Sequence, residues 1–292
     1  MNRRHFLIMS SLSLAAASLS AHARQAHQLH AICRELEHQS GGRLGVYLYD
    51  GRASTKNEQE FLYNGETRFP MCSIFKWLLA AAVLRRVESG QDRLDRKLRF
   101  SRQDLLEYSP TTEAHADGPG MSLAQLCEGA VADSDNTAAN LLLDALGGLP
   151  EFNAFLRAQG DSVTRLDRLE PMLNEARPGD PRDTSTPAAM GANLRRLLLG
   201  DGLSPASRQQ LKDWMLSTRT SGARLRADLE TGWQLADKTG TGGNGTTNDV
   251  GIYWTPTGEP IVLCVFLTAA LSDRAAQSAT IAAIGRAARA SA

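Results

Sequence analysis

A serine followed three residues later by a lysine is the feature of this chain best suited to covalent chemistry. Ser73 and Lys76 open an apolar stretch with helical spacing, so both side chains are expected on one face of a helix near its first turn. At such an end the free N–H groups and the helix dipole favour negative charge, and a backbone N–H can hold the oxyanion of an attacked carbonyl. A buried lysine has a lowered pKa and can accept a proton. A lone Ser-x-x-Lys is a weak signal, but this chain has five lysines and only one such motif.

A second serine lies in Ser134-Asp135-Asn136, directly before a helical stretch rich in Ala and Leu. Ser134 is suited to pass a proton to a leaving nitrogen, and the Asn136 amide can both donate to and accept from a substrate amide. The structural alternative is an N-cap of the following helix, for which Asp133 and Asp135 are also suitable. We expect both roles to hold.

A second lysine motif, Lys238-Thr239-Gly240, is typical of an edge strand that enters a Gly-rich turn. Lys238 brings a positive charge, and the hydroxyls of Thr239 and Thr241 can bind a substrate carboxylate. The Thr241 N–H is a candidate for the second oxyanion donor. In isolation the same stretch is equally typical of a plain hairpin turn.

The one long irregular segment, about residues 161–183, carries Glu170 and Asn174. A loop of this length inside a compact domain is usually functional. A carboxylate with a neighbouring amide can activate a water molecule as a general base. The alternative is an ordinary surface acid in a charged loop, since Asp167 and Glu175 lie nearby.

A serine–histidine triad is the obvious competing arrangement. His115 is the only histidine after residue 38, and nothing around it resembles a nucleophile elbow. We therefore expect lysine or glutamate as the base. The histidines and cysteines show no convincing metal-ligand spacing, so a bound metal is not expected.

In this order the motifs resemble those of the class A serine β-lactamases, and the resemblance covers essentially the whole mature chain. The Glu-x-x-x-Asn spacing, with Leu173 inside it, makes the match specific. It implies hydrolysis of the β-lactam ring of penicillins and cephalosporins through an acyl-enzyme on Ser73, which is released by water activated by Glu170. The base for acylation, Lys76 or Glu170, stays open. The catalytic residues it implies are Ser73, Lys76, Ser134, Glu170 and Lys238, with Asn136, Asn174, Thr239 and Thr241 as substrate-binding residues.

Further positions follow from the same resemblance. Tyr108 matches the aromatic wall of the cleft, although it also fits an ordinary half-buried loop aromatic. Arg224 is the candidate to reach the substrate carboxylate from a neighbouring loop, with Arg274 as the runner-up; the alternative for Arg224 is a solvated surface charge. Arg168 and Asp183 match the family's ion pair across the neck of the long loop.

The cysteines depart from the family's bridged patterns. In the carbapenem-hydrolysing subgroup the cysteine that matches Cys72 is bonded to one at the position of Gly242, so that bridge is absent and a dedicated carbapenemase is not expected. Cys127 matches half of another family bridge, but Ala80 occupies the partner position. We therefore expect free thiols.

Two rival functions share the three motifs. One is a penicillin-binding DD-peptidase or transpeptidase, and the other is a β-lactam sensor module that acylates and stays acylated. Glu170 with Asn174 disfavours the peptidase. The lack of a membrane-anchoring stretch in the mature chain disfavours both.

The N-terminus is typical of an export signal. Arg3-Arg4, an apolar run and a small-residue cleavage site ending at Ala23 indicate the twin-arginine type, with an ordinary secretory signal as the alternative. Removal of residues 1–23 takes away two arginines and no acid, which changes a balance of 32 basic and 32 acidic residues to a net charge of −2. We expect residues 24–292 to be a periplasmic monomer that binds a small β-lactam substrate, with no nucleic-acid partner and no stable membrane anchor.

Periodicity predicts the fold. Residues 25–39 and about 272–290 have helical spacing, while 44–49, 250–254 and 261–267 are typical of strands. The helical patterns between them cover residues 73–88, 122–131, 136–146, 150–158, 186–199 and 205–215, without convincing strands.

These patterns indicate an α+β fold: an antiparallel β-sheet with flanking N- and C-terminal helices plus an all-helical domain. We expect a single catalytic unit, residues 24–292. Its α/β part would comprise residues 24–68 and 216–292, and its all-helical part residues 69–215.

Overall fold

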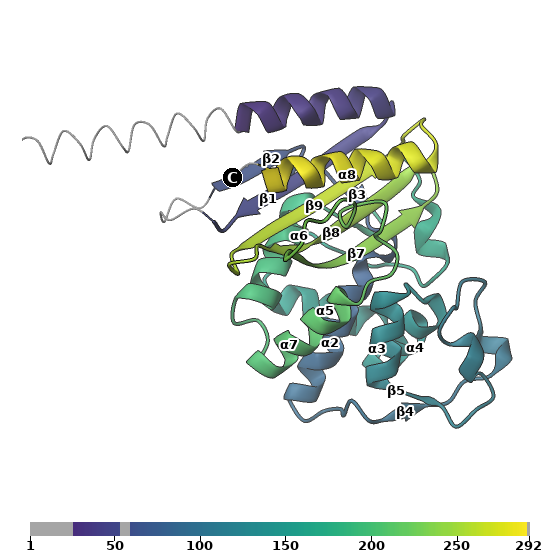
Figure 1. The fold of residues 1–292 in the computed structure, drawn as a ribbon. Helices are drawn as coiled ribbons and strands as arrows, with labels where there is room; N and C mark the ends of the chain where they lie inside the picture. The colour runs from purple at the N-terminus through teal and green to yellow at the C-terminus, as the bar shows by residue number, and fades with distance from the viewer. Residues whose placement is uncertain (1–25, 53–58, 291–292) are drawn as a thin grey trace, which may run out of the picture.

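The computed structural model describes residues 26–52 and 59–290, and its centre is an antiparallel sheet of five strands in the order β2-β1-β9-β8-β7 (Figure 1). The strands are β1 (Arg43–Asp50), β2 (Gln59–Tyr63), β7 (Gln234–Gly242), β8 (Thr246–Trp254) and β9 (Pro260–Thr268). The pairing of β1 with β9 joins the two ends of the chain in one sheet, as the sequence predicted. The short edge strand β2 was not predicted, because five residues carry little periodic signal.

Both faces of the sheet are covered, because successive strand residues point to opposite sides. On β9, Leu263 and Val265 belong to one core with the helix of residues 26–40 and with α8 (Arg274–Ala290), whereas Val262 and Cys264 belong to the core of the helical part. Figure 1 shows the two terminal helices on one side of the sheet and the other helices on the opposite side. The predicted α+β class is confirmed.

Six α-helices lie between β2 and β7, at the positions that the sequence predicted. They are α2 (Phe75–Glu88), α3 (Leu123–Ala132), α4 (Asn136–Leu146), α5 (Leu149–Ala158), α6 (Pro187–Leu194) and α7 (Pro205–Leu216). Two boundaries differ by more than one residue from the prediction. A 3₁₀ turn, η1 (Cys72–Ile74), precedes α2, and the end of the predicted helix 186–199 is a π-helical turn, η5 (Arg195–Leu199).

Short elements complete this part of the chain. The sequence predicted no strands here, but two-residue strands pair as β3 (Phe69–Pro70) with β6 (Thr184–Ser185) and as β4 (Lys97–Leu98) with β5 (Met121–Ser122). Such bridges are too short to produce periodicity. The remaining 3₁₀ turns are η2 (Arg102–Asp104), η3 (Glu113–His115) and η4 (Met172–Glu175), the last of them inside the long loop.

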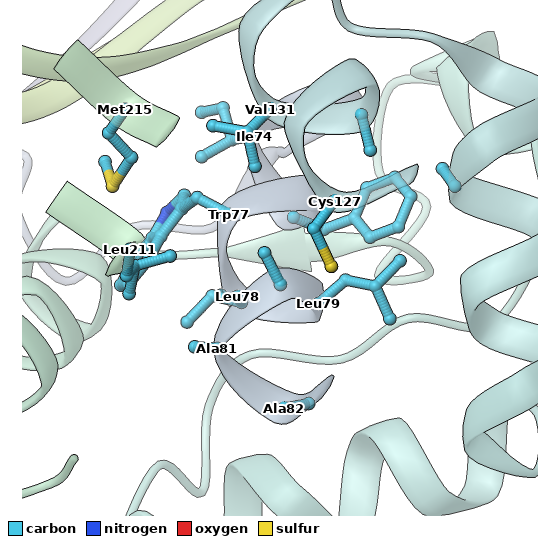
Figure 2. Packing of buried hydrophobic residues seen from close by; sticks show 14 of the residues in the cluster. Ile74, Trp77, Leu78, Leu79, Ala81, Ala82, Cys127, Val131, Leu211 and Met215 are labelled. Atoms are coloured by element: carbon cyan, nitrogen blue, oxygen red, sulfur yellow. The ribbon is translucent and has the colours of Figure 1, made fainter. Parts of the chain in front are cut away.

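Helix α2 is the centre of the helical part. Ten consecutive residues, from Phe75 to Leu84, are buried all round the helix. Figure 2 shows Trp77 beside Leu211 of α7, while Leu79 lies toward Cys127 of α3. A helix packed on every side cannot shift without losing contacts, so its first turn is a rigid platform for the residues that it carries.

All four cysteines are buried and unbridged. Within the described part of the chain, no helix has the length and apolarity needed to cross a bilayer. Within that same part, His, Cys, Asp and Glu side chains do not gather in threes in the way that a metal ion requires.

Candidate active site

The candidate nucleophile lies at the start of α2. Ser73 is in η1 and is 8% exposed, whereas Lys76, one turn further on, is fully buried. The Asn248 amide of β8 donates to the carbonyls of Pro70 and Met71 at 2.9 and 3.2 Å. A buried side chain of the sheet therefore holds the turn that presents Ser73.

Three oxygen acceptors surround the ammonium of Lys76. Its Nζ lies 2.9 Å from Glu170 Oε1, 2.7 Å from the Ser134 carbonyl and 2.6 Å from Asn136 Oδ1. Burial lowers the pKa of Lys76, and the charge of Glu170 acts in the opposite direction. Three segments far apart in the sequence thus meet at one side chain.

The link between α3 and α4 presents Ser134. Asp135 is the N-cap of α4, since its carboxylate accepts from the Ala138 N–H at 2.8 Å. Ser134 has a φ of +63°, in the left-handed region, and its Oγ accepts from Lys238 Nζ at 3.0 Å. Within this motif, the Asp135 side chain therefore caps α4 and the Ser134 side chain contacts the second lysine.

The edge strand β7 carries the second buried lysine. Lys238 is fully buried, and besides Ser134 it donates to the Thr239 carbonyl at 2.7 Å. Burial, and then repulsion from Lys76, lowers the pKa of Lys238 to about 7. The edge-strand prediction for this motif is confirmed: Lys238 lies inside the nine-residue strand β7, and the turn that joins β7 to β8 begins only after Gly242.

Two glycines let β7 approach the turn at Ser73. A Cβ at Gly240 would lie 2.5 Å from the Met71 carbonyl, and a Cβ at Gly242 would lie 2.5 Å from Cys72 Sγ. Neither contact is tolerable, so a larger residue would push the strand away from the nucleophile. The second pair also shows that the two positions bridged in the carbapenem-hydrolysing subgroup face each other here.

Glu170 contacts the candidate nucleophile directly. Ser73 Oγ donates to Glu170 Oε1 at 3.2 Å, and the Asn174 amide donates to Oε2. Asn140 of α4 holds the backbone of Glu170, accepting from its N–H at 3.0 Å and donating to its carbonyl at 2.9 Å. Asn140 was not singled out from the sequence, although its spacing of four from Asn136 places both on one helix face.

The neck of the long loop is closed by ion pairs. Arg168 Nε lies 2.6 Å from Asp183 Oδ2, and Arg168 Nη1 lies 2.7 Å from Glu175 Oε2. The buried carboxylate of Asp183 also accepts from the N–H groups of Asp167 and Arg168, at 2.7 and 2.9 Å. The predicted pair is confirmed, and it fixes both ends of the segment that carries Glu170.

Arg224 belongs to the site and is not a solvated surface charge. It is 8% exposed, and it donates to Thr241 Oγ1 at 2.7 Å and to the carbonyls of Gly240 and Asn248 at 3.1 and 2.9 Å. Burial lowers its pKa. The runner-up, Arg274, is exposed and donates to the backbone at the start of β8.

The remaining candidates lie around the same site. Tyr108 is 51% exposed, and its carbonyl accepts from the Asn136 N–H at 3.0 Å. The hydroxyl of Thr239 lies 2.6 Å from that of Thr220, a residue that the sequence did not single out. The sequence could not show the contact between Thr220 and Thr239, because nineteen positions separate the two threonines.

Known proteins are similar to this chain in sequence and in fold. A family model described as the Beta-lactamase enzyme family matches residues 27–291. The chain is 46% identical to β-lactamase FAR-1 of Nocardia farcinica over 230 residues, 79% of this chain and 72% of that protein. It is 44% identical to β-lactamase OXY-2 of Klebsiella oxytoca over 262 residues, 90% of this chain and 88% of that protein.

Solved structures of class A β-lactamases are also similar to this chain. An ancestral (GNCA) class A β-lactamase is 58% identical with a TM-score of 0.85, over 89% of this chain and 98% of that chain. The putative class A β-lactamase PenP from Rhodopseudomonas palustris is 48% identical with a TM-score of 0.87, over 91% of this chain and 100% of that chain. The chain therefore belongs to the class A β-lactamases, a family of serine hydrolases.

Proposed function

We propose that this enzyme hydrolyses penicillins and cephalosporins through an acyl-enzyme on Ser73. One observation carries the proposal: the nucleophile and a buried lysine converge on the same carboxylate oxygen. Ser73 Oγ lies 3.2 Å, and Lys76 Nζ 2.9 Å, from Glu170 Oε1. A serine activated in this way is the arrangement that acyl transfer requires.

Acylation begins when Ser73 Oγ attacks the lactam carbonyl. Its proton goes to Glu170, which it contacts, or to a neutral Lys76. The N–H groups of Ser73 and Thr241 hold the oxyanion. As the C–N bond breaks, Ser134 gives its proton to the ring nitrogen; its oxygen already accepts from Lys238, so the O–H is free to donate. The proton taken from Ser73 then returns to Ser134 by way of Lys76 and Lys238, so that Glu170 is a carboxylate again before deacylation.

Deacylation uses the other side of Glu170. Its Oε2 accepts from Asn174, whose own Oδ1 is a buried acceptor without a protein donor. A water placed between these oxygens can lose a proton to Glu170 and attack the ester. Ser73 then leaves with a proton, which restores the resting enzyme.

The substrate carboxylate has a cationic binding site on β7. Lys238 and Arg224 supply positive charge, and Thr239 and Thr241 supply hydroxyls. Asn136 would bind the substrate's side-chain amide, and the ring of Tyr108 would border the cleft. No metal or organic cofactor enters this scheme.

A chromogenic cephalosporin in large molar excess tests the proposal. We expect sustained turnover until the substrate is exhausted, and none in Ser73→Ala. A burst of one equivalent that then stops would mean acylation without release, which would favour the peptidase or the sensor module instead.

We also propose that residues 1–23 form a twin-arginine export signal, which lies outside the described residues, and that a monomer of residues 24–292 works in the periplasm. The proposed division into an α/β part, residues 24–68 and 216–292, and an all-helical part, residues 69–215, puts the site between the two parts. Cell fractionation, N-terminal sequencing and sizing of the mature protein test location, cleavage and oligomeric state.

A further inference from the structure

A basic pocket lies behind the long loop and apart from the proposed active site. Its volume is about 470 Å³, and it is bounded by residues 67–70, by residues 176–180 of the loop and by the ends of β1 and β9. None of the residues to which we assign catalysis or substrate binding lines it. The pocket therefore has no part in the proposed reaction.

The lining carries excess positive charge. Three arginines and one aspartate line the pocket, a formal charge of +2: Arg43, Arg68 and Arg177 with Asp180. The aspartate is already paired with Arg182, outside the lining, at 2.7 Å, and this hydrogen bonding lowers the pKa of its carboxyl. It is not available to neutralise the arginines. Arg177 is itself paired with Glu175, outside the lining, so the two charges without a partner carboxylate are those of Arg43 and Arg68.

Among residues 26–52 and 59–290, two of these arginines contact only uncharged groups. Arg43 donates to the Arg68 carbonyl at 3.1 Å and stacks over the ring of Phe69 at 5.0 Å. Arg68 donates to the Val163 carbonyl at 2.9 Å and to Thr184 Oγ1 at 3.0 Å. Neither guanidinium has a carboxylate partner among the ion pairs of the described chain.

Three other pockets on the described surface differ from this one in charge. The pocket between α2 and α5 has two arginines and two glutamates, which balance. A pocket beside η5 has a formal charge of +1, and another at residues 159–163 has −1. The charge of +2 is thus higher than that of the three other pockets compared.

We propose that this pocket binds a compact oxyanion, namely a phosphate group, between Arg43 and Arg68. The guanidinium fork matches phosphate oxygens bidentately, and the hydroxyl of Thr67 in the same lining adds a donor. The volume accommodates inorganic phosphate or a phosphomonoester.

A bound phosphate group would also brace the loop that carries Glu170. Arg177 of the loop lines the pocket opposite Arg43 of the sheet, and Asn244 ties the same part of the loop to the sheet by donating to the Ala176 carbonyl at 2.9 Å. An anion bound by Arg43 and Arg68 that also attracts Arg177, whose guanidinium is paired with Glu175, would add a second link between loop and sheet. Any effect on turnover rests on the proposed function, whereas binding itself does not.

Calorimetric titration of the ligand-free enzyme with inorganic phosphate, at an ionic strength held constant with NaCl, tests the site. We expect one saturable site, weakened about tenfold or more in Arg68→Ala. Arg99→Ala is the matched control, because it removes an exposed arginine outside the pocket and should leave the affinity unchanged. If Arg68→Ala does not fold, Arg43→Ala serves in its place. Equal affinity in all variants, or no binding to the wild type and to vesicles, would overturn the proposal.

Two controls distinguish the pocket from the active site as the place where phosphate binds, and a lipid headgroup from free phosphate as its source. Phosphate bound at the active site would inhibit competitively, raising KM without changing kcat, whereas phosphate in the pocket would not compete with substrate. Cosedimentation with phosphatidylglycerol but not phosphatidylcholine vesicles, lost in Arg68→Ala, would assign the site to a lipid headgroup. Binding of free phosphate without cosedimentation would assign it to a soluble ligand.

Discussion

Lys76 and Lys238 are both fully buried, but their surroundings differ. Lys76 lies 2.9 Å from a carboxylate oxygen of Glu170, whereas Lys238 donates only to a hydroxyl and a carbonyl. Burial lowers the pKa of both lysines. At Lys76 the charge of Glu170 opposes this effect, while at Lys238 the charge of Lys76 adds to it.

The different surroundings of Lys76 and Lys238 suit the two lysines to two different tasks. A lysine paired with a carboxylate can exchange a proton with it, which suits the region of the nucleophile. A lysine without a contacting carboxylate keeps its attraction for an anion from outside, which suits the region of the substrate carboxylate. If Lys238 binds the substrate carboxylate as proposed, that role would explain why a buried cation is retained there despite its cost in stability.

Removing the carboxylate makes the surroundings of Lys76 resemble those of Lys238. Glu170→Gln should still acylate through Lys76, but deacylation should fall by about 10²–10⁴-fold because the water loses its base. Mass spectrometry should then find a stable adduct equal to the added penicillin. Glu107→Gln, at an exposed position next to Tyr108, is the control and should turn over normally. Rapid turnover by Glu170→Gln would show that Glu170 is not the base for deacylation.

Replacing each lysine by methionine tests the comparison through stability. Lys76→Met leaves Glu170 buried without its cation and should lower the free energy of unfolding by about 3–5 kcal/mol. Lys238→Met removes a cation without a contacting carboxylate and should raise it by about 0.5–2 kcal/mol. Urea unfolding at pH 7 measures both. Shifts of the same sign would show that the two environments are equivalent.

The pH dependence of substrate binding should follow Lys238. Its ammonium is charged below about pH 7 and neutral above. If only the charged form attracts the substrate carboxylate, KM for a penicillin should rise about tenfold from pH 6 to pH 8. Lys238→Arg should flatten this profile, because a guanidinium keeps its charge. A wild-type KM that is constant across this range would contradict the assignment.

The same pKa predicts a change in stability with pH. Between about 7 and the ordinary value of 10.5, the unfolded chain holds a proton on Lys238 that the native state has lost. Stability should therefore rise with pH across this window, by up to about 1.4 kcal/mol per pH unit. Lys238→Met should remove that contribution, which pH-dependent urea unfolding can measure.

Most of the fold and the proposed catalytic residues could be predicted, because motif and periodicity are local properties. Helix α4 begins and ends at the predicted residues, 136 and 146. Two of the three motifs lie directly before a helix, Ser73 before α2 and Ser134 before α4, and the third lies in the middle of the edge strand β7.

What could not be predicted depends on contacts between distant segments. Asn140 holds the backbone of Glu170, and Asn248 holds the turn before Ser73, yet neither belongs to a motif. The lowered pKa of Lys238 likewise follows from burial next to Lys76, which no spacing in the sequence encodes. These residues act through the contacts that the fold gives them with distant segments, and the sequence alone does not show those contacts.

Arg224 gives the finest test of the comparison, because its charge is one of those that lower the pKa of Lys238. Arg224→Ala should raise KM about fivefold through loss of a charged donor. It should also move the alkaline rise in KM upward by about half a pH unit, since one repulsive charge has gone. Arg274→Ala is the matched control: that arginine is exposed and contacts the start of β8, so neither effect is expected. A profile that moves equally in both variants would mean that general surface charge, and not the surroundings of Lys238, sets its affinity for the substrate carboxylate.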